Sequence, residues 1–483
     1  MKRLVIFPIL TILLFITSSC EKVLEVDNLS VFGTEAVWKD KSLVEAYLAD
    51  CYAAGLPGGW PVNMGDWADE SAGIHGEGDV QTSAGAFKYW PYSSIRKFNV
   101  LLEEINKGDL SEEFINQTKG QVYFLRAFQY FNAVVHHGGV PIIKKAQLLN
   151  DDLMVPRSST SDCFDFILED LEKAISMLPD KSAGDDYGRV DKAAALAFKG
   201  RVLLYKASPQ FNPSNPYDNA YWEEAYTATK AAKDQLESWG SGLVSNYDDI
   251  FTTEGHSEAV LPVVFIEPGK VNGRGENGVR PLSESHDATG YDQPIWSLVS
   301  SYPMKDGKMP GHSPKYSYDL QSYWENRDPR FYSTIIYNGS VCPLGKSPDR
   351  RQYNDCVVGD ITDGFCPGSS WIRTGFFCNK GLDHSLPQQN AELNEFDWLE
   401  IRFAEVLMNF AEAANETGHP EEAITVLKRI RDRAGIEPGE NNMYGMEQGM
   451  TRDEIREAIY HERYIEFAFE GKRFWDLRRA RRL

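Results

Sequence analysis

Apolar residues recur three and four positions apart over long segments of this chain, and this spacing constrains its fold more than any other feature. The period is that of amphipathic helices, each of which must bury its apolar stripe against another element. The pattern covers residues 34–54, 92–108, 116–139, 158–179, 190–207 and 220–238, and later 398–418, 420–435 and 451–480. The sequence therefore predicts a mainly α-helical protein.

Small residues within these segments indicate how the helices pair. Ala411, Gly418 and Ala423 fall at the offsets expected of tetratricopeptide (TPR) repeats, and Gly200 and Ala225 fit a second pair of helices. Residues without bulky side chains let two antiparallel helices approach closely. We therefore expect a scaffold of TPR-like helical hairpins.

Residues 240–390 interrupt the helical pattern. They are rich in Gly, Pro, Asn, Tyr and Ser and contain short strand-like pieces such as 259–266. Because long loops in a compact protein are usually functional, we expect a loop-rich, partly β, ligand-binding region here, joined by a second loop at 55–92. The predicted order is an N-terminal TPR-like part at 34–239, this region, and C-terminal TPR-like helices at 391–483, all in a single domain.

The N-terminus has the features of a secretory signal peptide. Two basic residues precede an apolar run over residues 4–16, which is too short to span a bilayer, and small residues then lead to Cys20. A cysteine in this position resembles a bacterial lipobox. Residues 1–19 are thus predicted to be removed, and Cys20 to carry a lipid at the head of an acidic leader over 20–33. The alternative is an ordinary signal peptide followed by an incidental cysteine.

The cysteine pattern favours disulfides over a metal site. Of the seven cysteines, six remain when Cys20 is set aside, and export would place them in an oxidising compartment. No CxxC pair is present, which argues against zinc. We expect one or two disulfides within the loop-rich region, and the alternative is that these cysteines are free and buried. The candidates are Cys342, Cys356, Cys366 and Cys378.

Charge and motif content argue against several functions. The net charge of −21 disfavours nucleic acid as a partner. No GxSxG, HExxH or phosphate-loop spacing is present, so we expect no catalytic residues, no metal and no cofactor. Glu462, Glu466 and Glu470 share a helical stripe, whereas glycosidase carboxylates face each other across a cleft, so we expect framework ion pairs with nearby arginines. His136 and His137 precede two glycines and are expected at a helix C-terminus rather than on a metal.

Several stretches, taken in order, resemble the SusD/RagB family of nutrient-binding outer-membrane lipoproteins. The resemblance runs over nearly all of the mature chain, and Cys20 with its acidic followers fits the same family. The matching stretches are residues 120–143, 187–207, 301–307, 326–339, 398–416, 429–436 and 461–479.

The resemblance implies a TPR-like helical scaffold with a loop-rich ligand site, on the outer face of the outer membrane. It implies pairing with a SusC/RagA-type TonB-dependent transporter, and an oligosaccharide ligand. A peptide ligand is the alternative; a glycan-degrading enzyme and a pure scaffold are further ones. Members of the family usually continue past the helix near residue 480, so the chain looks short at its C-terminus, either as a fragment or as a member without that tail.

Aromatic residues in the loops are the candidates for ligand contact, because Trp and Tyr combine rigid apolar faces with one polar tip. No motif marks their positions. We expect some of them to form an oligosaccharide platform with a rim of polar side chains. The aromatic candidates are Trp60, Trp67, Trp90, Tyr291, Trp296 and Trp371, and the polar ones are Asp66, Asp69 and Asn277.

Overall fold

The computed structural model describes residues 34–61, 64–72, 87–148, 150–267, 269–272, 275–286, 289–356, 363–365 and 371–483. The predicted signal peptide, the lipidation site Cys20 and the acidic leader lie outside these residues. Within the described part of the chain, no helix is long and apolar enough to cross a membrane.

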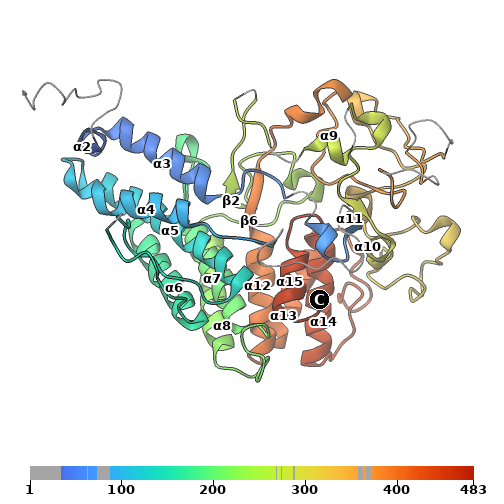
Figure 1. Cartoon of the computed structure of the whole chain (residues 1–483). Coiled ribbons are helices and arrows are strands. Elements are labelled where there is room, and N and C mark those ends of the chain that lie inside the picture. The colour runs from blue at the N-terminus through green and yellow to red at the C-terminus, as the bar shows by residue number, and fades with distance from the viewer. Residues whose placement is uncertain are drawn as a thin grey trace, which may run out of the picture.

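Helices make up the N-terminal half, drawn from blue to green in Figure 1. Several begin at a side-chain cap, which satisfies amide groups that the first helical turn leaves open. Asp40 caps α3, and Ser159 forms a capping box with Asp162 at the start of α6. The helices are α2 (Thr34–Val37), α3 (Lys41–Gly55), α4 (Tyr92–Glu104), α5 (Glu112–His137), α6 (Thr160–Met177), α7 (Lys192–Ala207) and α8 (Tyr221–Ser238).

These helices pack as hairpins, as the sequence predicts. α5 packs on α6 and α7 packs on α8. A Cβ on Gly200 of α7 would lie 3.1 Å from the Thr229 side chain of α8, so a small residue is needed at this crossing. α5 ends at Gly138, which has a φ of 74° and whose N–H donates to the Val134 carbonyl. His136 and His137 therefore lie in the last turn of the helix, as expected.

The C-terminal part begins with a strand, which corrects the prediction of one helix from residue 398. β6 (Trp398–Arg402) is buried along its whole length and pairs antiparallel with β2 (Ala259–Val263). The helical stretch starts only at Phe403, because the preceding residues hydrogen-bond across to β2. The helices that follow are α12 (Phe403–Glu416), α13 (Pro420–Arg433), α14 (Arg452–Glu466) and α15 (Arg473–Arg479).

The last predicted helix is likewise broken in two. α14 ends at Glu466, and Phe469 and Gly471 take φ values of 60° and 65° before α15 begins. Positive φ values interrupt a right-handed helix. Glu470 therefore lies in this turn and not on the helical stripe predicted for it.

The region between the two helical parts is mostly irregular, as expected, and lies on the right in Figure 1. A second hydrophobic cluster joins this region to the end of α14 and includes Phe331, Phe377 and Ile465. The short elements include two-stranded antiparallel ladders, in which β3 pairs with β1 of the early loop and β4 pairs with β5. They are β1 (Ser71–Ala72), α9 (Glu276–Val279), β3 (Gln293–Pro294), α10 (Trp296–Ser301), α11 (Pro329–Thr334), β4 (Ile335–Ile336) and β5 (Phe377–Cys378).

The three glutamates of the C-terminal stretch form a buried ion network, which confirms the framework interpretation. Glu466 accepts hydrogen bonds from Arg330, Arg402 and Arg433. The sequence suggested partners within the same stretch, yet these arginines come from α11, β6 and α13. The network thus links the C-terminal helices to the loop-rich region.

The cysteine prediction is met in part. Cys356 is disulfide-bonded. Cys342 and Cys378 are buried and form no disulfide, which agrees with the alternative for these two, and Cys366 lies outside the described residues.

Candidate functional site: an aromatic surface beside the β1–β3 ladder

The β1–β3 ladder brings the two predicted ligand loops together. Ser71 pairs with Pro294 and Ala72 with Gln293, and the Ile295 N–H donates to the Glu70 carbonyl over 3.1 Å. The early loop thereby lies against the start of α10, more than 200 positions along the chain. Only this pairing places Trp296, the first residue of α10, at the junction of the two loops.

The buried side chain of Gln293 organises the loops around the ladder. Its Nε2 donates to the carbonyls of Gly290 and Trp371, and its Oε1 accepts the Arg373 N–H over 2.7 Å. A Cβ on Gly290 would overlap the Trp371 carbonyl, so the two loops meet at van der Waals distance. The backbone that carries Trp371 is therefore held in a defined place relative to Tyr291 and Trp296.

A group of aromatic side chains surrounds Trp296, and we call it the aromatic surface. The Trp296 ring is 42% exposed, packs edge-on against Tyr323 with centroids 5.3 Å apart, and lies roughly parallel to Phe376 at 6.3 Å. Trp324 and Tyr337 stack on each other at 5.5 Å. The members of the aromatic surface are Trp296, Tyr323, Trp324, Tyr337 and Phe376.

The electrostatics of this surface suit binding more than proton transfer. Burial raises the pKa of Tyr323 and of Tyr337 above the ordinary value for a phenol. Both hydroxyls stay protonated at neutral pH and can donate or accept a hydrogen bond. Among the described residues, no group of three or more His, Cys, Asp or Glu side chains is placed to hold a metal ion.

Four other predicted residues lie near the ladder. Trp371 is 50% exposed. Tyr291 is partly buried, with its N–H donating to the Gly278 carbonyl over 2.8 Å. Asp69 pairs with Arg473 through both carboxylate oxygens at 2.7 Å, and Asp66 accepts from the Ser71 hydroxyl at 2.6 Å.

Two predicted contact residues are structural, which corrects their assignment. Trp60 is buried between Phe251 and Trp398, and its indole N–H donates to the Phe469 carbonyl over 2.9 Å. Asn277 is buried, and its side-chain oxygen accepts from the Ser285 hydroxyl and the His286 N–H. Both side chains are occupied by the interior, so neither offers a face to a ligand.

The remaining two predicted tryptophans lie away from the aromatic surface. Trp67 packs against Phe87 and edge-on against Phe474 of α15. Trp90 is 42% exposed and stacks on His137 at the end of α5, with centroids 4.2 Å apart. The structure therefore divides the predicted tryptophans among the core, the aromatic surface and a separate place beside α5.

Four members of the aromatic surface escaped the sequence analysis: Tyr323, Trp324, Tyr337 and Phe376. The density of aromatic residues between 316 and 337 was a usable signal. It was missed because the neighbouring stretch at 326–339 was interpreted only as a resemblance to a family.

The fold and the surface define a class of protein: a helical-hairpin scaffold that presents aromatic side chains from long loops. Comparison with known proteins identifies the family. A family model described as "SusD family" matches residues 257–482, and one described as "Starch-binding associating with outer membrane" matches residues 68–204. The chain belongs to the SusD/RagB family.

Individual relatives agree with this assignment over nearly the whole chain. A SusD-like protein (P38) of Formosa agariphila is 26% identical over 99% of this chain and 92% of its own length. A SusD-like protein of Bacteroides fragilis superposes with a TM-score of 0.77 at 27% identity, covering 93% of this chain and 88% of that one. A SusD-like carbohydrate-binding protein of the same species superposes with a TM-score of 0.76 at 24% identity, covering 92% and 87%.

Proposed function

We propose that this protein is a cell-surface lipoprotein that captures oligosaccharides and delivers them to a TonB-dependent outer-membrane transporter of the SusC/RagA type. The aromatic surface is the capture site, with Trp371 and Tyr291 beside it. The observation that carries the proposal is the half-exposed ring of Trp296, which is supported from behind by Tyr323 and Phe376.

The physical basis is the match between sugar rings and aromatic faces. A pyranose has an apolar face of C–H groups and a rim of hydroxyls, so it stacks on an indole while its rim hydrogen-bonds to neighbours. Trp296 is already ordered by packing, so little side-chain entropy is lost on binding. The Tyr323 and Tyr337 hydroxyls, and Asp69 across the ladder, supply polar groups nearby.

Support for a glycan over a peptide comes from the family description "starch-binding" and from the carbohydrate-binding relative. The lipid anchor at Cys20 rests on the lipobox-like sequence, and the transporter partner rests on the family. The three C-terminal glutamates, which were the candidates for acid–base catalysis, are all engaged by arginines.

Affinity electrophoresis in gels containing soluble starch, laminarin or another glycan tests the proposal. Retardation of the intact protein by one of them, without release of reducing sugar, is the expected result. Trp296→Ala is expected to remove the retardation, whereas Met154→Ala, at an 86% exposed apolar residue in the α5–α6 connection, leaves it unchanged. A peptide array that binds when no glycan does, or measurable glycan cleavage, would overturn the proposal.

A further inference from the structure

A second feature, separate from the aromatic surface, is a cavity of about 590 Å³ between the N-terminal helices and the C-terminal part. Its lining comes from the end of α3 and the residues that follow it to Pro61, from Met64, from the 88–91 segment, and from α5, α7, β6, α12, α14, α15 and the turn before α15. A volume of this size falls in the range of small-molecule sites in proteins. Neither the proposed capture site nor the ion network accounts for it.

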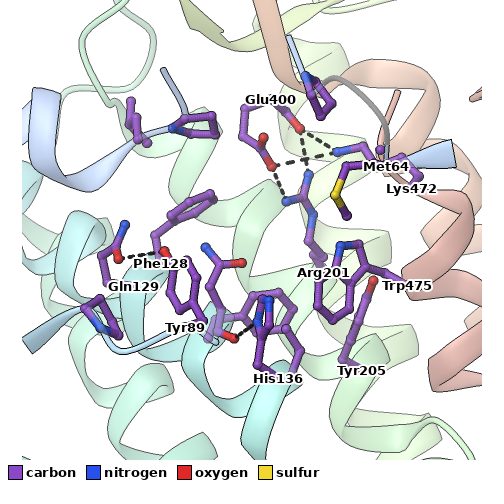
Figure 2. Close-up of a pocket in the computed structure, with 18 of the residues that line it drawn as sticks. Met64, Tyr89, Phe128, Gln129, His136, Arg201, Tyr205, Glu400, Lys472 and Trp475 are labelled. Carbon is purple, nitrogen blue, oxygen red and sulfur yellow. Dashed lines mark hydrogen bonds and ion pairs between the residues drawn. The ribbon is translucent and has the colours of Figure 1, made fainter. Parts of the chain in front are cut away.

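One wall of the cavity is charged. Arg201 donates to Glu405 and Glu400 at 2.6 Å, and Lys472 lies 3.2 Å from Glu405 and donates to the Glu400 carbonyl over 2.8 Å. Figure 2 shows Arg201, Glu400 and Lys472 joined in this way, with Tyr89, Gln129 and His136 across from them. The two cations and two anions of this group pair with each other. Arg463 and Glu470, which also line the cavity, pair with Asp476 and Arg402, and Lys88 is exposed.

The same wall retains hydrogen-bonding capacity. A carboxylate has about four lone-pair positions, and an ammonium group has three donors. Glu400 Oε1 accepts from Arg201 and its Oε2 from the Trp398 indole at 3.2 Å, which leaves positions free for further donors. A ligand with groups that both donate and accept, such as hydroxyls, would use these positions and the adjacent ammonium group together.

The opposite wall is aromatic. Tyr89 stacks on His136 with centroids 4.8 Å apart, and Trp90 stacks on His137 at 4.2 Å with the rings 5° from parallel. Burial lowers the pKa of His136 to about 4, so its ring is neutral at pH 7. The Trp475 ring meets His136 edge-on at 4.6 Å. These flat, uncharged faces can contact the apolar face of a ring.

We propose that this cavity is a second binding site and takes a neutral, hydroxyl-rich ring compound, namely a mono- or disaccharide. The acids of this wall are already paired with bases, so a charged ligand would have to compete with an existing ion pair, and a hydrocarbon would leave the polar wall without hydrogen bonds. A short saccharide satisfies both walls. The inference rests on the proposed function in one respect: the same glycan would supply the short saccharide.

Isothermal titration with glucose, maltose, cellobiose and laminaribiose tests the inference on the full chain. Two variants address the cavity: Trp90→Ala removes the stacked face at its edge, and Asn132→Phe fills space beside Tyr89. Both side chains line the cavity and neither is fully buried, so the fold is expected to survive, which circular dichroism checks. Met154→Ala, at an exposed apolar residue in the α5–α6 connection, is the control.

We expect a saccharide to bind the wild-type protein. Trp90→Ala should weaken this binding about tenfold, the effect of losing one aromatic contact, and Asn132→Phe should weaken it at least as much because the new ring occupies the ligand's space. Met154→Ala leaves this binding unchanged, while the cavity variants keep the retardation by polymeric glycan. Binding that Asn132→Phe leaves intact, or that Trp296→Ala abolishes, overturns the inference. The inference is also overturned if the wild-type protein is retarded by a glycan but binds no short saccharide. The proposed function stands in that case. Short-saccharide binding at the cavity without any glycan retardation would instead remove the proposed capture site.

Discussion

Glu466 Oε1 lies 2.7 Å from Nη1 of Arg402, and this contact ties the end of α14 to β6 in the centre of the molecule. Arg330 and Arg433 bind the same carboxylate, and Arg402 also reaches Glu258 and Glu470. Burial by itself would raise the pKa of Glu466, but the three arginines hold it well below its ordinary value. The charge is thus permanent at physiological pH, and so is the link between helices and loops.

Removal of this carboxylate is expected to be severely destabilising. Glu466→Ala leaves three arginines buried without their shared partner, and breaking buried pairs of this kind costs about 3–5 kcal/mol. Urea unfolding of wild type and variant measures the difference. The control is Glu457→Gln, nine positions earlier in α14. It breaks an exposed ion pair with Arg482 and should lower the free energy of unfolding by less than about 1 kcal/mol. Equal effects of the two substitutions would contradict the framework role.

Glu70 is predicted to limit stability at neutral and alkaline pH. Burial raises its pKa to about 8, although the Phe469 N–H and Arg473 act in the opposite direction. Since the folded state holds the proton more tightly than the unfolded state does, stability falls as pH rises from about 4.5 to 8. Glu70→Gln keeps an oxygen for the Phe469 N–H and removes this titration.

The expected result is a variant more stable than wild type at pH 8 and similar to it at pH 4.5. Melting temperatures across this range provide the measurement. A variant that is less stable at pH 8 would show that Glu70 is held as a carboxylate.

His136 is predicted to make the fold sensitive to acid. Burial lowers its pKa to about 4, with His137 and Arg478 adding to the effect, so the unfolded chain binds a proton between pH 6.5 and 4 that the folded chain does not. Its stability contribution is therefore complete above pH 6.5 and is lost as the pH falls, by up to roughly 3 kcal/mol. His136→Phe retains the aromatic contacts with Tyr89 and Trp475. Chemical denaturation at pH 7 and pH 4.5 should show a smaller drop for the variant, and an unchanged drop would place the acid sensitivity elsewhere.

Gln293 is predicted to position the capture site without touching the ligand. Gln293→Leu removes the side-chain hydrogen bonds to Gly290, Trp371 and Arg373, and leaves buried carbonyls without donors at about 1–3 kcal/mol. We expect weaker retardation by glycan together with reduced stability. The same substitution at Gln235, which is exposed on α8, is the control. Loss of stability with full glycan affinity would mean that Trp371 does not contribute to binding.

Trp296 and Trp371 are predicted to contribute separately to glycan affinity. Each alanine substitution removes one exposed ring and should weaken binding about tenfold, near 1.4 kcal/mol. Titration with a glycan that retards the wild-type protein measures both variants and their combination. Two single variants with wild-type affinity would discard this surface as the capture site.

The helical content and the hairpin pairing could be predicted from the sequence because they depend on local signals. The three-and-four apolar period sets which face of a helix is buried, and small residues such as Gly200 and Ala411 mark close crossings. Where a local signal competed with a tertiary one, the prediction was wrong. The apolar period predicted that residues 398–402 begin a helix, but these residues form a strand that pairs with β2. The period also predicted one helix at the end of the chain, but the turn at Phe469 divides it in two.

The site is the part for which the sequence was least sufficient. Trp60, Trp90 and Trp296 all lie in stretches of the sequence that look alike in composition, but one is in the core, one is beside a cavity and one is on the aromatic surface. By itself the sequence determined the family, the helical scaffold and the kinds of side chain available for binding. Only the tertiary structure decided which of them meet. The β1–β3 ladder joins loops that are more than 200 residues apart, the Gln293 side chain joins Gly290 to Trp371, which is 78 positions from Gln293, and no local pattern encodes such contacts.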